Sequence, residues 1–292
     1  MSNSGHGGAD GKDSAFKARL MHLFADWKVR PFTSEENLFP SDLLRSLREI
    51  GALDALLPLE EGGFGLVSSS DSGDLLSLLL RRTGYLSLSL GRCLEGHVNV
   101  VRLVGLYGTQ EQRHTLATTS KKGILAGIWV TDGVPPVTIR KEGGLYRLSG
   151  LNGFASGVHE VGLALITATT EQEESVMLLV PTTDAARRRP GPGKLTGMQA
   201  SGTGAYDFTG LTVSAQDILG AAGDYLRQPE FSAGAWRGSA VALGAMDRLV
   251  DLLREELLAR KRAHNPHQLC RIGDAMIFQK TASLWVRQAA HA

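Results

Sequence analysis

The spacing of apolar residues divides the chain into a helical first part, a strand-rich middle and a helical last part. In the first part, apolar residues recur every three or four positions, which predicts helices at 14–27, 41–53, 71–82 and 86–106. Thr109, followed three residues later by Gln112, predicts a capping box that opens one more short helix. Residues 1–13 are polar and rich in glycine, and we expect them to form a disordered tail.

At Gly123 the apolar period changes from nearly four to two, which indicates strands. Glycine, proline and asparagine turns separate the predicted strands, at 124–131, 145–150, 161–169, 175–180 and 205–213. The segment 187–193 is predicted to be a loop. Alternation through 206–213 predicts a sheet with one buried and one polar face.

From about Gln228 the helical period returns, with a long amphipathic pattern over 231–262 and a last helix from Pro266 to the end. The last helix carries an apolar face that two helices cannot enclose. We therefore expect this face to pack on another subunit, or the domain to have lost its end. The fold class is α+β, with the tail at 1–13, a helical domain at 14–122, a β-barrel or sheet domain at 123–220 and an incomplete helical bundle at 221–292.

Charge and cysteine usage narrow the function classes. The formal net charge is +1, from 31 basic and 30 acidic residues, so no overall field attracts nucleic acid or an anionic membrane. Cys93 and Cys270 share no motif, which favours a reducing compartment, and His264 and His267 flank Pro266 without a further ligand, so we expect no metal site. No apolar run approaches the roughly 20 residues of a membrane span, and the N-terminus has no signal peptide pattern. We predict a cytoplasmic protein.

The most informative stretch joins two predicted strands. Trp129 and Thr131 lie on the first strand, and Phe154 and Ser156 lie in the turn that ends the second. Two flat faces and two hydroxyls suit a planar, hydrogen-bonding cofactor such as a flavin ring. The alternative is that Trp129 and Phe154 are ordinary core residues of a sheet.

The order of the motifs resembles the acyl-CoA dehydrogenase superfamily from about Phe39 onward. The first part matches in Pro58-Leu-Glu-Glu-Gly-Gly-Phe-Gly65 and Tyr107-Gly-Thr-Gln-Glu-Gln-Arg113. The middle part matches in Trp129-Val-Thr-Asp132, Phe154-Ala-Ser-Gly157 and Gly197-Met-Gln-Ala-Ser-Gly-Thr203. Each motif alone is weak, but their order and spacing together are specific.

The resemblance implies two helical domains that grip a middle β-domain, with FAD between the strands and the C-terminal helices. In relatives, the positions of Trp129, Thr131, Phe154 and Ser156 contact the flavin ring, and many relatives have Trp where this chain has Phe154. The implied reaction is α,β-dehydrogenation of an acyl thioester, in which a carboxylate removes the α-proton and the β-hydrogen leaves as hydride to the flavin.

The chain departs from the family at three places. No residue matches the catalytic glutamate, so the catalytic residue is unknown; Lys261-Arg-Ala-His-Asn265 contains no carboxylate. The loop Asp132-Gly-Val-Pro-Pro-Val137 lacks the small hydroxyl residue that helps hold the substrate in relatives. The family's Arg-x-x-Phe-Gly motif is also missing, and Arg262 is our candidate for its phosphate contact, with a helix C-terminal cation as the alternative.

Three functions fit these observations. The first is a flavin-dependent dehydrogenase acting on an acyl-CoA or a related small molecule, in a homo-oligomer. The second is a flavin monooxygenase of the same fold, which needs no thioester base. The third is a non-catalytic or shortened subunit that packs against a complete, larger flavoprotein partner, as the apolar face of the last helix suggests.

Overall fold

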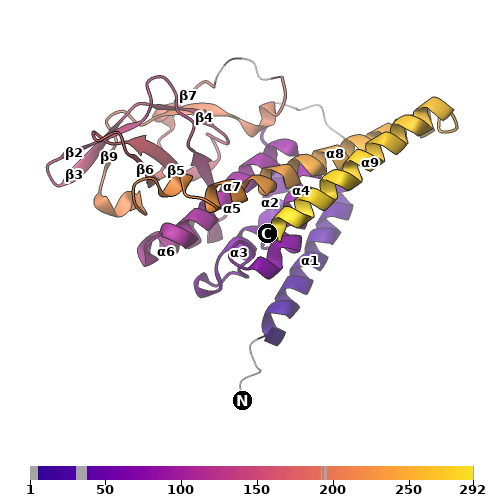
Figure 1. Cartoon of the computed structure of the whole chain (residues 1–292), viewed down its shortest axis with the longest axis horizontal. Helices are drawn as coiled ribbons and strands as arrows, with labels where there is room; N and C mark the ends of the chain where they lie inside the picture. The colour runs from indigo at the N-terminus through magenta and orange to yellow at the C-terminus, as the bar shows by residue number, and fades with distance from the viewer. Residues whose placement is uncertain (1–5, 31–37, 192, 194–195, 292) are drawn as a thin grey trace.

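In the computed structural model, residues 6–30, 38–191, 193 and 196–291 are described. Helices fill one side of the molecule and the strands gather on the other, as Figure 1 shows. The long helices are α1 (His6–Lys28), α4 (Gly73–Leu86), α5 (Leu88–Tyr107), α6 (Gln110–Lys121), α8 (Ala235–Ala259) and α9 (Pro266–Ala290). The shorter helices are α2 (Ser41–Glu49), α3 (Ala52–Leu56) and α7 (Glu230–Ala233).

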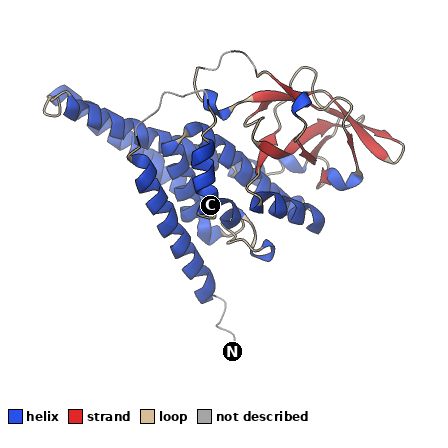
Figure 2. Cartoon of the chain, turned by 180° about the vertical axis from the view of Figure 1, so that it is seen from behind, coloured by secondary structure: helices blue, strands red, loops and turns tan. Residues whose placement is uncertain are grey.

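Two sheets make up the middle part, which is seen from behind in Figure 2. The larger sheet has the strand order β10-β6-β5-β2-β3-β9, and β1 pairs in parallel with β5. The smaller sheet has the order β4-β8-β7. The strands are β1 (Leu125–Trp129), β2 (Thr138–Glu142), β3 (Leu145–Ser149), β4 (Leu151–Ala155), β5 (Val161–Thr169), β6 (Ser175–Pro181), β7 (Arg188–Arg189), β8 (Gly204–Asp207), β9 (Thr212–Val213) and β10 (Ile218–Leu219).

The α+β class and the order of helices, sheet and helices are confirmed, but several element bounds differ from the prediction. Helix α1 begins at His6, so residues 6–13 are helical rather than a disordered tail, and residues 1–5 lie outside the described residues. The predicted strand at 205–213 is two strands in different sheets, because the chain turns at Gly210, whose φ is +78°. The predicted loop at 187–193 contains the short strand β7.

The predicted N-terminal and C-terminal helices share one core. Helices α4 and α8 cross so closely that a Cβ on Gly84 would lie 2.2 Å from the carbonyl oxygen of Val241. A Cβ on Gly244 would lie 2.0 Å from the carbonyl oxygen of Arg81. Two glycines therefore let the helices touch backbone to backbone. The division into separate domains stays a prediction.

Strand β1 is anchored to helix α5 through a buried histidine. The backbone N–H of Ala126 donates to Nδ1 of His97 at 2.9 Å, and Nε2 of His97 lies 3.5 Å from the Ser120 hydroxyl on α6. Burial lowers the pKa of His97 to about 4, so the ring is neutral near pH 7. His97 therefore gives β1 a hydrogen-bond partner on the edge that faces away from β5.

The predicted capping box at the start of α6 is confirmed: the Thr109 side chain accepts from the Gln112 backbone, and the Gln112 side chain accepts from the Thr109 backbone. Gln112 also donates to the carbonyl oxygens of Gln216 and Ile218, at 2.8 and 2.9 Å. The side chain that completes the cap thus also joins α6 to the end of the sheet. None of the helices over the described residues is both long and apolar enough to cross a membrane.

Candidate functional site

The candidate site lies where the chain leaves β1 and runs beside β4. The carbonyl oxygen of Thr131 accepts a hydrogen bond from the Gly153 backbone at 3.1 Å, and Asp132 forms a bridge with Asn152. The Gly133 N–H donates to the carbonyl oxygen of Leu151 at 2.9 Å. This pairing places Thr131 opposite Gly153, the residue that precedes Phe154 in the sequence. Two segments that are about 20 positions apart in sequence therefore form one edge.

Trp129 is a buried support of this edge rather than part of its surface. Its side chain is 1% exposed, and its ring lies 5.6 Å from that of Tyr206. Its indole Nε1 donates to the carbonyl oxygen of Ser156 at 3.0 Å. The β1 pleat turns this ring into the core, and the expected contact of Trp129 with a cofactor stays a prediction. What it does is fix the turn that carries Ser156.

Phe154 and Thr131 are the exposed members of the edge. Phe154 is 47% exposed, which is unusual for a large aromatic side chain in a sheet whose other rings, Tyr206 and Phe208, are buried. Thr131 is also exposed. Trp129 is thus buried in the core, whereas Phe154 is not. Whether Phe154 and Thr131 contact a cofactor stays a prediction.

Ser156 belongs to a chain of three hydroxyls. The Thr203 hydroxyl lies 3.4 Å from that of Ser156 and 2.8 Å from that of Ser201. The Gly157 N–H donates to the carbonyl oxygen of Ser201 at 2.8 Å, which holds the two turns together. Ser201 and Thr203 were not among the candidate site residues. Both lie in the motif Gly197-Met-Gln-Ala-Ser-Gly-Thr203, which is the signal that could have identified them.

Arg262 is not brought to this edge within one chain. It is exposed, and it lies between α8 and α9, where its N–H donates to the carbonyl oxygen of Leu257 at 2.8 Å. Figure 1 shows this turn at the far end of the helical block from the strands. A contact from Arg262 to a cofactor therefore needs a second subunit, and it stays a prediction.

Helix α5 forms the wall behind the edge. A Cβ on Gly96 would lie 3.6 Å from a methyl carbon of Ile128, and a Cβ on Gly157 would lie 3.2 Å from the sulfur of Cys93. Burial raises the pKa of Cys93 to about 12, so this thiol stays protonated and unreactive. The wall is closely packed at these two positions.

A network of charged side chains joins α5 to the start of α8. Glu95, which is 7% exposed, accepts hydrogen bonds from Arg92 and from the side-chain amide of Asn99. Arg237 donates from Nη1 to Oδ1 of Asn99 at 2.7 Å, while its Nε is buried without a hydrogen-bond partner. Burial lowers the pKa of Arg237, with a smaller effect from nearby Arg102. The sequence did not reveal the link to α8, because Arg237 lies 138 positions from Asn99.

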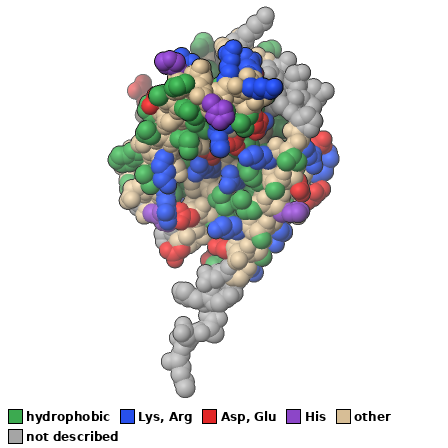
Figure 3. Space-filling model, turned by 90° about the vertical axis from the view of Figure 1, so that its right-hand side faces the viewer, with side chains coloured by type: hydrophobic (Ala, Val, Ile, Leu, Met, Phe, Trp, Pro, Cys, Tyr) green, Lys and Arg blue, Asp and Glu red, His purple; other side chains and the backbone are tan. Residues whose placement is uncertain are grey.

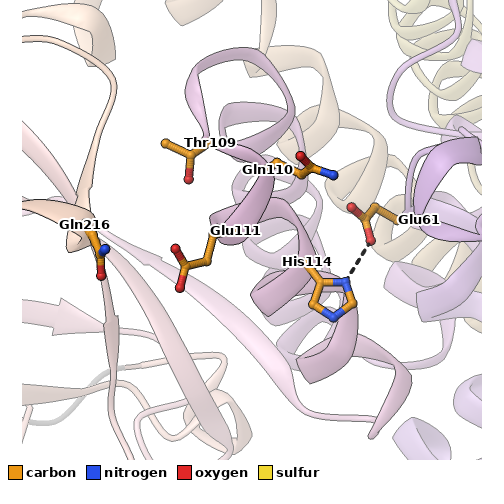
Figure 4. Close-up of a pocket in the computed structure, with 6 residues that line it drawn as sticks. All are labelled: Glu61, Thr109, Gln110, Glu111, His114 and Gln216. Atoms are coloured by element: carbon orange, nitrogen blue, oxygen red, sulfur yellow. Dashed lines mark ion pairs between the residues drawn. The ribbon is translucent and has the colours of Figure 1, made fainter.

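An open cleft of about 660 Å³ lies elsewhere, between α6 and the end of the sheet. Figure 4 shows its lining, which includes Glu61, His114 and Gln216; Nδ1 of His114 lies 3.6 Å from a carboxylate oxygen of Glu61. It contains none of the predicted site residues. In the described part of the chain, no group of three or more His, Cys, Asp or Glu side chains is arranged to hold a metal ion.

Comparison with solved structures gives the fold. Butyryl-CoA dehydrogenase from Megasphaera elsdenii matches with a TM-score of 0.78 at 16% identity, over 99% of this chain and 80% of that one. Glutaryl-coenzyme A dehydrogenase matches with a TM-score of 0.78 at 18% identity, over 100% of this chain and 78% of that one. The chain has the acyl-CoA dehydrogenase fold. A complex of TdsC from Paenibacillus sp. A11-2 with FMN and indole also matches, with a TM-score of 0.71 at 18% identity, over 98% of this chain and 75% of that one.

Sequence relatives match over part of their own length. Isobutyryl-CoA dehydrogenase of Dictyostelium discoideum is 24% identical over 261 residues, which are 83% of this chain and 61% of that protein. Dibenzothiophene monooxygenase of Rhodococcus qingshengii is 26% identical over 188 residues, which are 60% of this chain and 44% of that protein. The chain thus spans less than two thirds of the length of these relatives. No family model matches it.

Proposed function

We propose that this chain binds a flavin at the edge formed by Thr131, Phe154 and Ser156 and acts as a flavin-dependent oxidoreductase. The observation that supports the proposal is the backbone pairing of 131–133 with 151–153, because it joins the segment that carries Thr131 to the strand that leads to Phe154 and Ser156. Support also comes from the fold, which it shares with an FMN-bound protein and with acyl-CoA dehydrogenases.

The donor set fits a flavin ring. Phe154 offers an exposed flat face, and the hydroxyls of Thr131 and Ser156 can each donate to a ring heteroatom. Thr203 orients the Ser156 hydroxyl, and Trp129 fixes the backbone of the same turn. A site whose donors are held by such neighbours loses little entropy on binding. We propose FAD as the flavin, as the family resemblance implies.

The leading reaction is the α,β-dehydrogenation of an acyl thioester. A bound flavin supplies the redox step, and the protein must orient the substrate, exclude water and provide a base. Helix α5 and the start of α8 would form the substrate side of the site, because α5 already packs behind β1. An acyl-CoA or related thioester is therefore the proposed substrate.

A specific observation favours a second candidate, a flavin monooxygenase. Glu95 is a buried carboxylate of the α5 wall, but Arg92 and Asn99 hold it in a charged network. Each of its two carboxylate oxygens already accepts one of these hydrogen bonds, so neither is free to take an α-proton. Oxygen activation by a reduced flavin needs no such base, and dibenzothiophene monooxygenases are among the sequence relatives.

Flavin binding is tested by reconstituting the purified chain with FAD and, separately, with FMN, followed by gel filtration and absorbance spectroscopy. We expect a bound flavin, and we expect Thr131→Ala and Phe154→Ala each to weaken binding about tenfold, the size of one lost hydrogen bond to a ligand or one lost aromatic contact. Thr212→Ala changes an exposed hydroxyl residue on β9, in the other sheet, and serves as the matched control. A chain that stays colourless with both flavins refutes the proposal.

The two reactions are separated by the source of electrons. Short-chain acyl-CoA thioesters should bleach the bound flavin under anaerobic conditions if the chain is a dehydrogenase. A monooxygenase should instead require an external reductant and should consume oxygen once its flavin is reduced. The flavin absorbance and oxygen uptake of the same preparation distinguish these outcomes.

A further inference from the structure

Four helices enclose an open cleft that lies apart from the proposed flavin edge. Its volume is about 560 Å³, which is within the range of small-molecule sites. It is lined by side chains of α1, α4, α8 and α9: Lys28, Arg81, Arg82, Tyr85, Asp247, Asp251, Met276, Gln279, Lys280 and Ser283. Figure 3 looks at the α8–α9 end of the molecule and shows many Lys and Arg side chains among apolar ones.

Both acidic side chains of the cleft already have their partners. Asp247 is 6% exposed and accepts from Arg81 Nη2 at 2.9 Å and from Gln279 Nε2 at 2.6 Å. Asp251 accepts from Lys28 Nζ at 2.8 Å and from the Tyr85 hydroxyl at 2.7 Å. Burial alone would raise the pKa of Asp251, but the hydrogen bonds from Lys28 and Tyr85 hold it below its usual value. Both carboxylates therefore already have hydrogen-bond donors inside the cleft.

Two cations of the cleft are left without a carboxylate. Arg82 and Lys280 form no ion pair with any residue in the described ranges. The Arg82 guanidinium lies 4.2 Å from the ring centre of Phe24, and its Nε is buried without a hydrogen-bond partner. Since four cationic and two acidic side chains line the cleft, it carries two positive charges in excess.

Arg82 is half-buried, and its buried Nε leaves one donor unmet, so an anion in the cleft would complete its hydrogen bonding. Its planar fork can pair with two oxygens of a phosphate or a carboxylate, while the exposed Lys280 adds a second positive charge at the rim. We propose that this cleft binds the anionic group of a small molecule, a phosphate or a carboxylate, between Arg82 and Lys280. The site contains no residue of β1 or β4, so it is independent of the proposed flavin edge.

The test is calorimetric titration of the full chain, in a low-salt buffer free of both anions, with inorganic phosphate and, separately, with succinate. We expect saturable binding of at least one probe, and the tighter probe identifies the chemistry of the natural ligand. Arg82→Gln and Lys280→Gln should each raise the Kd of that probe about tenfold, the effect of one lost charged hydrogen bond. Lys280 is exposed, so its variant should fold even if Arg82→Gln does not.

Arg140→Gln is the matched control, because Arg140 is an exposed arginine on β2, away from the cleft. We expect its Kd to equal that of the unchanged chain. Titration of flavin-reconstituted protein should give the same Kd, which separates this site from the flavin edge. The proposal is overturned if neither probe binds saturably, or if Lys280→Gln and a folded Arg82→Gln both bind like Arg140→Gln.

Discussion

The sheet end around Trp129 and the α8–α9 hairpin differ in how far a tryptophan side chain is buried. Trp129 is 1% exposed, packs against Tyr206 and donates a hydrogen bond to the Ser156 backbone. Trp285, on α9, is 72% exposed, and Val286 is the buried residue of that helix. Apolar side chains therefore build a closed core in one region and an open surface in the other.

The contrast teaches that the two regions depend on different interactions. In the sheet, β1 is fixed by β5, by His97 and by the turn at Ser156, so its core contacts are made within the chain. In the hairpin, polar contacts hold α9 to α4 and α8, as when Gln279 and Arg81 both bind Asp247. The prediction that the apolar face of α9 packs on another subunit stays a prediction.

The largest expected difference in stability is between the alanine variants of the two tryptophans. Trp129→Ala should lower the free energy of unfolding by about 3–5 kcal/mol, because it leaves a cavity and removes the hydrogen bond to Ser156. Trp285→Ala should change it by less than about 0.5 kcal/mol. Urea unfolding followed by circular dichroism measures both. Equal losses would show that the hairpin face is as well packed as the sheet core.

The second prediction concerns pH. Because burial lowers the pKa of His97 from 6.5 to about 4, the unfolded chain gains a proton below pH 6.5 that the folded chain does not. The free energy of unfolding therefore decreases as the pH is lowered below 6.5. For His97 the decrease is about 1.4 kcal/mol per pH unit and about 3 kcal/mol in total by pH 4. Above pH 6.5 this effect is absent.

Unfolding curves measured between pH 7 and pH 4 test this dependence. His97→Gln, whose amide oxygen can still accept from Ala126, should flatten the pH dependence by that amount. His267→Gln is the control from the hairpin, because His267 is exposed, and it should keep the slope of the unchanged chain. An unchanged slope in His97→Gln would show that other groups cause the acid sensitivity.

The smallest expected change in stability comes from replacing two helical glycines, one in each helix of the hairpin. Gly244→Ala should destabilise the chain by about 1–3 kcal/mol, since the new Cβ would meet the backbone of α4 at 2.0 Å. Gly273→Ala on α9 meets nothing within 4 Å and should stabilise it by about 0.5–1 kcal/mol. Thermal unfolding of the two variants gives the sign directly. A loss at Gly273 would place a neighbour against that face of the hairpin.

Much of the fold followed from local patterns. The helical period predicted α5, α8 and α9, and the spacing of Thr109 and Gln112 predicted the capping box of α6. Strand β2 was missed because Thr138–Glu142 holds a single apolar residue, Ile139, and becomes a strand only through its pairing with β3. A pairing partner supplies the hydrogen bonds that the sequence pattern does not show.

The candidate site stays a prediction, but the sequence anticipated part of its geometry. The motif order named Thr131, Phe154 and Ser156, whose segments lie side by side, whereas the period of two could not tell which face of β1 is the core and so did not predict the burial of Trp129. The network of Glu95, Asn99 and Arg237 had no sequence signal, because Asn99 and Arg237 are 138 positions apart. Contacts at such a separation depend on how whole helices pack.

By itself, the sequence determined which residues share a helix face, where caps and turns fall and which order of helices and strands the chain takes. Only the tertiary structure decided that α4 and α8 meet at Gly84 and Gly244, that Trp129 lies in the core and that Nε of Arg82 is buried without a hydrogen-bond partner among the described residues. The physical reason is that periodicity acts over a few residues, whereas burial and charge compensation depend on which distant surfaces pack together.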